Sequence, residues 1–500
     1  MSYLGAAQSL VRARVYRVPT SGWAASDTSE PLSHFPPGFS TAIAVPMARA
    51  RLSAVQSARL LIALAAFGTW AGLVLLVGGA VGTRVGVMTA LAALATPALL
   101  NVHLSVLSEP LFLTSLVATL YGIVQMTDPG LRARGRRQWV GVRAAALTGL
   151  VIAAAVMLRY VGVAWLAAAV VAALIGPVDP RRRWLTRVFR CVLVTAPATG
   201  ALAAWFVRSI RLAGPTSVRE PGLYGNLGET AREGLSTVSG WLVPTGSGTS
   251  SQIVAATIVI AAVALMASAW RQRRGGAAAV AWLRQNVSID VYRSASLLTG
   301  VAIMGAAYLV VVVASRALAD PNIPFDERML APLILLAEIG LGTTLALWWR
   351  GRGRVAQLAV GIVVAAWFVE SGVTSAARVL YALDDGNDFA GSDWRDSPTV
   401  AWVKAPDGGM HRVLYTNWPA ALYFRAGRAS HDLPDVTDAL TLRRFRERLE
   451  RNHGVLVGFS APNSDFASPD TLASILGLRP IARLSDGAVW ELPSDSALSK

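Results

Sequence analysis

The sequence predicts an α-helical polytopic membrane protein of about ten transmembrane helices with a small C-terminal α/β domain. Composition is the first observation: of 500 residues, 54% are hydrophobic and 15% are charged, and the mean hydropathy is +0.47. Average soluble proteins carry about 25% charged residues. Most of the chain is therefore expected to lie in a lipid bilayer, because it lacks the polar groups to cover a surface in water.

The acidic residues are the second observation, because they divide the chain in two. Sixteen of the 30 acidic residues follow residue 380. We therefore predict a membrane domain over 57–370 and a soluble α/β domain over 371–500. The single cysteine, Cys191, excludes an internal disulfide framework and a thiolate metal cluster.

Ten stretches have or approach the length and apolarity of a membrane-spanning helix, which needs about 20 mostly apolar residues. Several are shorter than this, so their predicted ends are accurate only to a few residues. The stretches are 57–80, 85–101, 109–126, 144–158, 161–176, 188–207, 252–270, 295–315, 329–349 and 355–370.

Arginines gather in every second loop between these stretches. Basic residues are retained in cytoplasmic loops, so 132–143, 181–187, 271–293 and 350–354 are predicted to be cytoplasmic. Much of the formal net charge of +16 therefore records membrane orientation. A nucleic-acid partner is not expected for charge distributed in this way.

The opposite loops are predicted to lie outside the cytoplasmic membrane, with residues 1–56 as the first extracytoplasmic segment and 371–500 as the last. Most acidic residues of the membrane part fall on this side, so carboxylate chemistry is expected there. Residues 1–37 contain no signal peptide or span. Either the N-terminus crosses unaided or a further helix precedes Met1, and we favour the second interpretation.

Two proline-containing elements on the outer side carry candidate functional residues. His34 is followed by paired prolines, which stop a helix, and 39–50 is then expected to form a juxtamembrane helix. Glu109 stands at the outer end of a span and precedes Pro110 in a first helical turn. Capping and the helix dipole explain Glu109 as well as a catalytic role does.

Several short motifs follow one another in a set order along the chain. They are His-Phe-Pro-Pro (34–37), Ala-Arg-Leu-Leu (58–61), Ser-Glu-Pro-Leu-Phe (108–112), Leu-Arg-Tyr-Val-Gly (158–162), Trp-Leu-Val-Pro (241–244), Asp-Glu-Arg-Met-Leu-Ala-Pro (326–332) and a Tyr-Thr-Asn-Trp-Pro element (415–419). This order resembles the polytopic glycosyltransferases of the GT-C class. The relatives suggested are similar to protein O-mannosyltransferases, aminoarabinose transferases of lipid A and galacturonosyltransferases of lipopolysaccharide core.

The resemblance implies transfer of a sugar from a polyprenyl-phosphate carrier to an acceptor hydroxyl, with inversion. Such chemistry needs a carboxylate base, a cationic clamp for the departing phosphate and a groove open to the bilayer. By motif, Glu109 corresponds to the acidic residue of the second outer loop. Arg328, Arg159 and the adjacent Tyr160 correspond to the donor phosphate site, with interfacial snorkelling as the alternative for the arginines.

The sequence departs from the family at its start. The principal acid of the family's first outer loop lies shortly before a Ser-Tyr-Leu-like sequence, whereas here 2–4 follows Met1 directly. The expected Asp and its helix would then lie upstream of Met1, or the protein is an inactive paralogue. Within the sequence, Asp27 and Glu30 are the candidates, and both are also typical of a solvated loop.

The C-terminal domain is predicted to bind the acceptor or to cover the active site. Short strands are expected at 412–416, 454–459, 479–484 and 487–492, and helices at 441–452 and from Ser468 onward. Neither a nucleophile elbow nor a phosphate loop is present in it. The resemblance implies that the acceptor, a glycan, lipid or protein, meets Tyr415 and Asn417, and the external His34 is a further candidate to bind the acceptor or a metal ion.

Two other functions are weighed against the transferase. A transporter or flippase would show inverted repeats and broken helices near the midplane, and we see no half-to-half symmetry. A GT-C-fold scaffold without activity is the second. Glu338 lies inside a span, where a functional carboxylate and a neutral, hydrogen-bonded one are both expected. A divalent metal ion held by the outer acids stays open, and no other cofactor is predicted.

Overall fold

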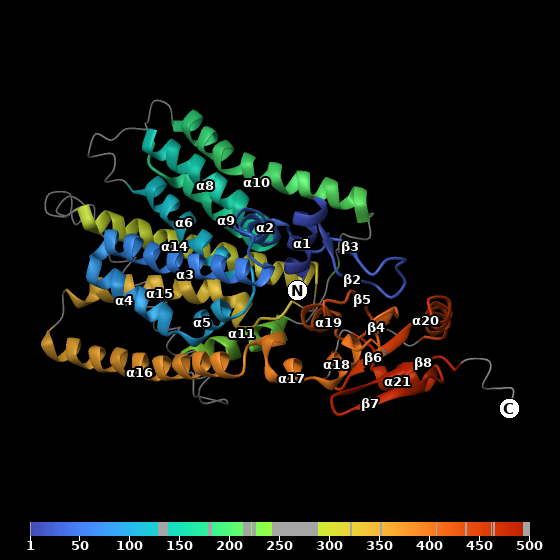
Figure 1. Ribbon diagram of the computed structural model, residues 1–500. Helices are drawn as coiled ribbons and strands as arrows, with labels where there is room; N and C mark the ends of the chain where they lie inside the picture. Colours follow the sequence, from blue (N-terminus) through green and yellow to red (C-terminus); the bar gives the residue numbers. More distant parts are fainter. Residues whose placement is uncertain are drawn as a thin grey trace, which may run out of the picture. The chain divides into compact units, whose positions relative to one another are not determined.

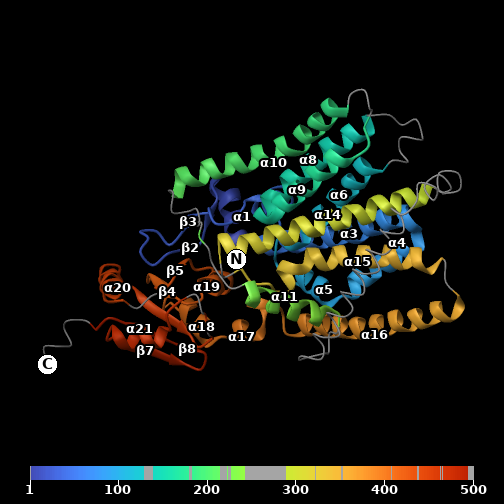
Figure 2. The same cartoon turned by 180° about the vertical axis from the view of Figure 1, so that it is seen from behind.

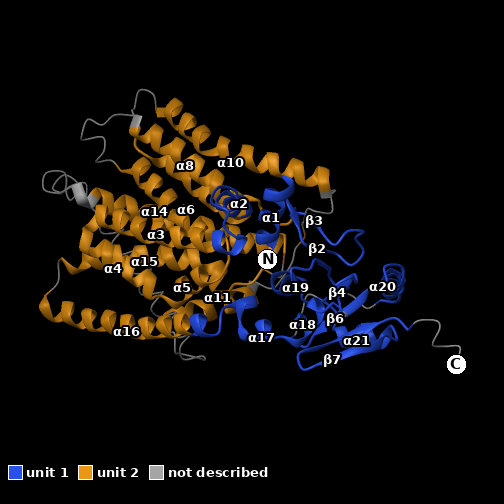
Figure 3. Ribbon diagram, in the orientation of Figure 1, with its two compact units in different colours: residues 1–33, 40–57, 381–500 blue, residues 34–39, 58–380 orange. Residues whose placement is uncertain are grey.

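The computed structural model (Figure 1) describes most of the chain and divides it into two compact units (Figure 3). The sheet unit comprises residues 1–33, 40–57 and 381–500, and the bundle unit comprises 34–39 and 58–380. The described residues are 2–128, 139–178, 183–213, 222, 227–242, 289–320, 323–350, 353–406, 408–435, 438–461, 463 and 466–493.

The bundle unit is built from long apolar helices. Within the described residues, seven helices are long and apolar enough to cross a membrane, or eight if one bent pair counts as a span. The protein is therefore a multi-pass membrane protein. The described helices of this unit include these spans and shorter helices between them. They are α3 (Ala54–Val81), α4 (Thr83–Ala95), α5 (Pro97–Leu104), α6 (Glu109–Thr127), α8 (Trp139–Leu158), α9 (Val163–Ile175), α10 (Arg183–Ala213), α11 (Leu227–Leu242), α14 (Ile289–Leu318), α15 (Glu327–Trp349) and α16 (Arg354–Asp384).

Most of the ten predicted spans correspond to these helices. Seven coincide with α3, α6, α8, α10, α14, α15 and α16, although α16 runs well past its predicted end at 370. The stretch 161–176 is a shorter apolar helix, Tyr160–Ile175, and 85–101 is the bent pair α4 and α5, with an angle of 66°. The predicted span 252–270 lies outside the described residues.

The break between α4 and α5 falls at Thr96, directly before Pro97, which cannot donate a backbone hydrogen bond. In a membrane the freed carbonyls must find partners inside the protein. Ser375 donates to the Ala95 carbonyl at 2.5 Å and Arg378 donates to the Pro97 carbonyl at 3.2 Å. The last span, α16, therefore holds the broken helix, although most of its surface is exposed.

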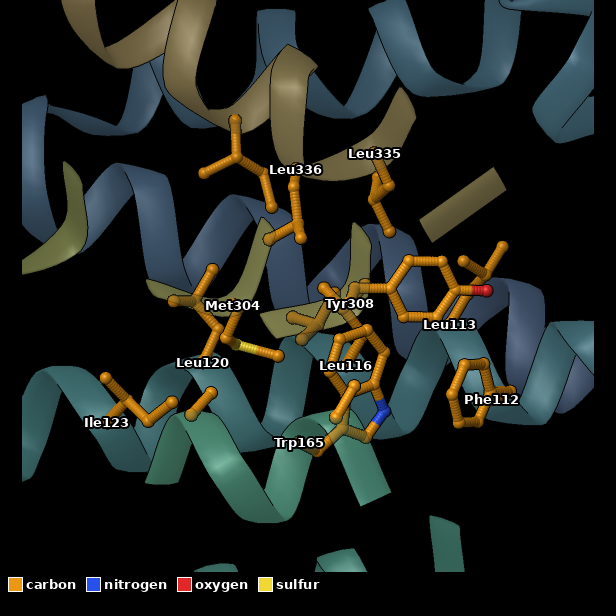
Figure 4. Close-up of a cluster of buried hydrophobic side chains, with 14 of the residues drawn as sticks. Phe112, Leu113, Leu116, Leu120, Ile123, Trp165, Met304, Tyr308, Leu335 and Leu336 are labelled. Carbon is orange, nitrogen blue, oxygen red and sulfur yellow. The ribbon is translucent and has the colours of Figure 1, made fainter. Parts of the chain in front are cut away.

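The core of the bundle centres on α6, which α8, α9 and α14 contact from different sides (Figure 2). Ala164, Ala168 and Ala172 of α9 are fully buried, because alanine lets helix backbones approach closely. Phe112 and Tyr308 both pack on Trp165, which stacks on them at ring distances of 5.1 and 5.3 Å (Figure 4). This aromatic stack fixes α6, α9 and α14 beneath one end of the bundle.

The sheet unit contains a six-stranded sheet in the order β2-β5-β4-β6-β8-β7. Neighbouring strands from β2 to β6 are parallel, and β8 pairs antiparallel with both β6 and β7. The predicted strands and both predicted helices of the C-terminal domain are present. The strands are β2 (Thr20–Ser21), β4 (Leu414–Thr416), β5 (Ser430–His431), β6 (Val455–Phe459), β7 (Arg479–Leu484) and β8 (Gly487–Glu491).

The helices of the sheet unit include two near the N-terminus. The chain starts with helix α1 (Ser2–Ala13), and the predicted juxtamembrane helix at 39–50 is α2 (Gly38–Ala50). A small ribbon pairs β1 (Arg17–Val18) with β3 (Glu30–Pro31). The C-terminal helices are α17 (Ser392–Arg395), α18 (Pro398–Lys404), α19 (Pro419–Ala426), α20 (Ala439–Arg451) and α21 (Pro469–Ile475).

The N-terminal segment completes the C-terminal sheet, which the sequence did not predict. Strand β2 pairs with β5 through two residues. Buried His431 lies with Nδ1 2.9 Å from Ser21 Oγ, and its ring stacks on Tyr415 at 4.9 Å. A two-residue polar strand whose partner lies some 410 positions away leaves no periodic signal in the sequence.

We expect the β2–β5 contact to weaken at acidic pH. Burial lowers the pKa of His431 below its ordinary value. The unfolded segment therefore binds a proton as pH falls through about 6.5, whereas the folded one resists it, so stability is lost between that pH and the lower folded pKa. Hydrogen exchange of the β2 and β5 amides, corrected for intrinsic rates, should accelerate between pH 7.5 and 5.5.

The matched variants are His431→Gln, which removes the titrating group, and His411→Gln, an exposed control. The first should abolish the additional exchange at low pH and the second should retain it. Identical pH dependence in wild type and His431→Gln would refute the assignment.

Candidate functional site

One carboxylate and two guanidinium groups meet at one end of the bundle. Glu109, the first residue of α6, forms ion pairs with Arg159 and Arg328. Arg328 Nη2 and Nε lie 3.1 and 3.3 Å from Glu109 Oε1, and Arg159 Nη1 contacts the same oxygen. The cluster joins the starts of α6 and α15 to the turn that follows α8.

Glu109 is positioned by its helix. It precedes Pro110 in the first turn of α6, where the helix dipole stabilises a negative charge. Only 3% of the residue is exposed. Burying a carboxylate without cationic partners costs free energy, so Glu109 needs the two arginines at this buried position.

Arg159 lies in an extended conformation between α8 and a short helical turn, Tyr160–Gly162. Its Nη2 lies 3.8 Å from Met329 Sδ, and Tyr308 donates a 2.8 Å hydrogen bond to the Met329 carbonyl. The aromatic stack under Tyr308 therefore supports the same region. A Cβ atom at Gly38 would collide with the Met157 carbonyl, so the His-Phe-Pro-Pro-Gly segment lies against the end of α8.

Arg328 projects from a first helical turn whose other residues are also fixed. Asp326 caps α15 by accepting a 2.9 Å hydrogen bond from the Met329 amide. Glu327 accepts from Arg378 of α16 at 3.0 Å. Half of the Arg328 side chain is exposed, so its guanidinium can bind an anion from outside while it contacts Glu109.

Helix α11 holds the segment that leads into α15. Glu233 pairs with Arg316 at 2.5 Å and accepts the Phe325 amide at 2.8 Å, and Thr237 donates to the Phe325 carbonyl at 2.6 Å. Burial raises the pKa of Glu233, but hydrogen bonds from Arg316 and the Phe325 amide hold it below its ordinary value. The segment before Arg328 is therefore fixed through both backbone and side chains.

Tyr160 faces α10. Its hydroxyl accepts a 2.9 Å hydrogen bond from Trp205 Nε1, and its ring stacks on Phe206 at 5.6 Å. Arg208 lies 4.5 Å above the Trp205 ring. Sequence reasoning missed Trp205 and Tyr308, since an aromatic residue inside an apolar helix gives no signal that separates it from core.

The opposite end of the bundle carries a different set of charges. Asp128, just after α6, pairs with Arg293 of α14 at 3.6 Å. Arg350, just after α15, donates to the Val81 carbonyl at 2.8 Å. Glu109 and its two arginines thus lie at one end of the bundle, and Asp128, Arg293 and Arg350 lie at the other. This separation follows the predicted alternation of loops between the two sides of the membrane.

The remaining candidates lie elsewhere. Asp27 and Glu30 belong to the sheet unit, where Asp27 pairs with Arg17 at 3.2 Å and Glu30 is part of β3. His34 is exposed in the bundle unit. Among the described residues, no group of three or more His, Cys, Asp or Glu side chains could hold a metal ion.

Tyr415 and Asn417 are structural residues of β4 and the turn after it. Tyr415 is fully buried, and Asn452 donates to its hydroxyl at 2.9 Å. Asn417 accepts from the Phe459 amide and donates to the Phe459 carbonyl, both at 3.0 Å. These contacts account for both side chains, and we do not include them in the proposed acceptor site.

Glu338 is buried in α15 beside the helix break. The hydroxyl of Thr96, the residue at the break, donates to its Oε1. A carboxyl group inside a span needs such a partner. Glu338 therefore belongs to the packing of the broken helix and not to the cluster around Glu109.

Comparison with known proteins finds similarity only in structure. No family model and no curated protein matches the chain. ArnT from Cupriavidus metallidurans in the apo state is 15% identical over 98% of this chain and 93% of its own, with a TM-score of 0.44. The oligosaccharyltransferase AglB from Archaeoglobus fulgidus, in complex with an inhibitory peptide and a dolichol-phosphate, is 11% identical over 92% of this chain, with a TM-score of 0.54.

The AglB comparison defines the class of fold. ArnT and AglB are both membrane glycosyltransferases of the GT-C class, so the predicted GT-C fold is confirmed, on the strength of the AglB comparison. The chain spans 65% of the length of that AglB structure. The apo form of the same oligosaccharyltransferase gives a TM-score of 0.52 at 10% identity. Identities this low show the fold, and the activity has to be argued from the site.

Replacing Glu109 should destabilise the bundle. Glu109→Gln leaves Arg159 and Arg328 without their carboxylate, and breaking a buried ion pair costs about 3–5 kcal/mol; half-exposed Arg328 places the expected loss near ~3 kcal/mol. Unfolding in detergent micelles measures it. Glu447→Gln, which breaks an exposed pair with Arg443, is the control and should change stability by less than ~1 kcal/mol. Equal stability of the two variants would contradict the assignment.

Proposed function

We propose that the protein is a glycosyltransferase that moves a sugar from a polyprenyl-phosphate-linked donor to a cell-envelope acceptor at the outer face of the cytoplasmic membrane. The observation that carries the proposal is the cluster of Arg159 and Arg328 around Glu109, at the end of the spans of a GT-C fold. The AglB structure of the same fold holds a dolichol-phosphate, which is a polyprenyl-type lipid phosphate.

The charge of the cluster suits a phosphate ester. Two guanidinium groups and one carboxylate leave one positive charge in excess, and arginine binds phosphate oxygens through parallel hydrogen bonds. Half-exposed Arg328 is the group that can reach a phosphate without leaving Glu109. As the bond between the anomeric carbon and the phosphate oxygen breaks, negative charge grows on that oxygen, and a fixed cation stabilises it.

The acceptor hydroxyl completes the reaction by attacking the anomeric carbon from the opposite face, which inverts its configuration. Its proton passes to a carboxylate base. Both arginines contact the same oxygen of buried Glu109. We therefore assign Glu109 to orienting the arginines rather than to accepting the proton.

The location of the cluster suits a lipid substrate. Arg159 and Arg328 lie at the ends of membrane-spanning helices, where a lipid phosphate group meets the hydrocarbon of its own tail. The polyprenyl chain would stay in the bilayer while its phosphate reaches the arginines. The acceptor, a glycan, a lipid or a protein, would then approach from the aqueous side.

A transporter would use the broken helix differently. In transporters with discontinuous helices, the freed backbone groups point into a central binding site. Here the carbonyls of Ala95 and Pro97 at the break are occupied by Ser375 and Arg378. The break is therefore accounted for by packing, which favours the transferase.

Arg328→Gln should reduce sugar transfer from a polyprenyl-phosphate donor by about 10²-fold, since removing one preorganised donor to a developing charge costs this much. Arg328→Lys should retain part of the activity, because it keeps the charge. The assay follows labelled sugar from donor to a membrane acceptor. Arg84→Gln, an exposed arginine at the start of α4, is the matched control. Full activity of Arg328→Gln would remove the site, and an inactive wild type would favour the scaffold alternative.

Membrane orientation can be tested independently of activity. A reporter that is active only outside the cytoplasm should be active when fused after Leu380 and inactive when fused after Arg350. Arg350 precedes α16 and Leu380 lies near its end, so one candidate span separates the two positions. The reverse result would place the cluster on the cytoplasmic side and refute the proposed location of the reaction.

A further inference from the structure

We propose that the sheet unit carries a saccharide-binding site between α21 and the β8–β7 edge of its sheet. The structure contains a cavity of about 260 Å³ at this place. Figure 1 shows α21 beside β7 and β8. Its lining includes Gly458 of β6, Asp470 of α21, Arg483 of β7, and Ala488 and Trp490 of β8.

Small residues on two paired strands, β6 and β8, lie beside Arg483 of β7 in the wall of the cavity. Gly458 pairs with Ala488 across β6 and β8, and Ala488 pairs with Arg483 across β8 and β7. Directly paired residues share one face of a sheet, and so do residues two apart along a strand. Trp490 therefore stands next to Ala488 on this face, and the short side chain of Ala488 leaves space beside Arg483.

The first turn of α21 covers one side of this space. A Cβ atom at Gly458 would collide with the Pro469 ring and the Trp490 indole, so only glycine allows the helix to approach the strand this closely. Asp470 follows Pro469 and is exposed. The sequence thus brings a carboxylate on the helix and a guanidinium on the edge strand to one cavity.

Asp470 and Arg483 form no ion pair or side-chain hydrogen bond within the described part of the chain, and both residues are exposed. A carboxylate only accepts hydrogen bonds and a guanidinium only donates them. Hydroxyl groups do both, so a neutral polyhydroxylated ligand can satisfy the two side chains together. Their charges compensate each other, which favours a neutral ligand over an anion.

The size and the wall of the cavity suit a single sugar ring. Its volume lies just below the ~300–1,000 Å³ of sites for drug-sized ligands. Trp490 is 8% exposed and contributes a small apolar part of the wall. Strand β7 is the last of the sheet, so a longer glycan can continue outward from the edge.

This inference deepens the proposed function and rests on it for one point, namely that the saccharide belongs to the acceptor. Binding itself is independent of Glu109 and Arg328. The site would hold an acceptor glycan and raise its local concentration at the enzyme. Loss of the site should therefore raise the KM for a glycan acceptor and leave kcat unchanged.

The experiment uses the full chain in lipid nanodiscs, since maltoside detergents would themselves occupy a saccharide site. Methyl glycosides of glucose, mannose, galactose and arabinose are the probes, and saturation-transfer NMR measures their binding. Asp470→Asn and Arg483→Gln each remove one charge from an exposed position, and Ala488→Leu fills the cavity. Asp435→Asn and Arg444→Gln are exposed controls elsewhere in the sheet unit.

At least one glycoside should bind to wild type and to both controls. Its affinity should fall at least fivefold in Asp470→Asn and in Arg483→Gln, and binding should be lost in Ala488→Leu. Equal binding in all proteins, or binding of glycine or inorganic phosphate without any glycoside, would overturn the proposal. Glycoside binding that persists in Arg328→Gln, whose transfer activity is lost, would separate this site from the transfer site.

Discussion

The structure of the end of the bundle that carries Glu109 depends on one constraint. The buried carboxylate of Glu109 has to be neutralised by cationic side chains. The helix dipole alone does not support a carboxylate that is 3% exposed, so Arg159 and Arg328 must reach it. This requirement fixes the turn after α8 and the first turn of α15 against α6. The contacts of Glu233 with Arg316 and Phe325 hold the preceding segment in the same arrangement. A structural need thereby creates a preorganised cationic site.

A second polar network serves the broken helix. The carbonyls of Ala95 and Pro97 and one carboxyl oxygen of buried Glu338 find hydrogen-bond partners within the protein, which a membrane requires because water cannot supply them. This explains why α16 contributes hydrogen bonds to the bundle although most of its surface faces outward. The bundle thus uses polar side chains in two ways. Some donate hydrogen bonds to backbone carbonyls at the helix break near Thr96, and others form the charged cluster around Glu109.

The sequence predicted the spans because each is a local property. A run such as 295–315 is apolar whatever surrounds it, and α14 occupies it. The pairing of Glu109 with arginines 50 and 219 positions away was suggested only by motif order, since no local pattern connects them. Tyr415 and Asn417 show the converse. Their motif indicated an acceptor site, but their positions in and just after a central strand commit them to the core.

The sequence by itself determined which segments lie in lipid and which lie in water, because hydropathy and charge are properties of each residue. It therefore specified a membrane bundle, a polar C-terminal domain and the alternation of basic loops. Tertiary structure decided which residues meet. It brought β2 to the sheet of the C-terminal domain, turned one predicted span into a bent pair, and left a cavity beside Trp490. These outcomes depend on packing and on hydrogen bonds between distant residues, which a linear pattern does not encode.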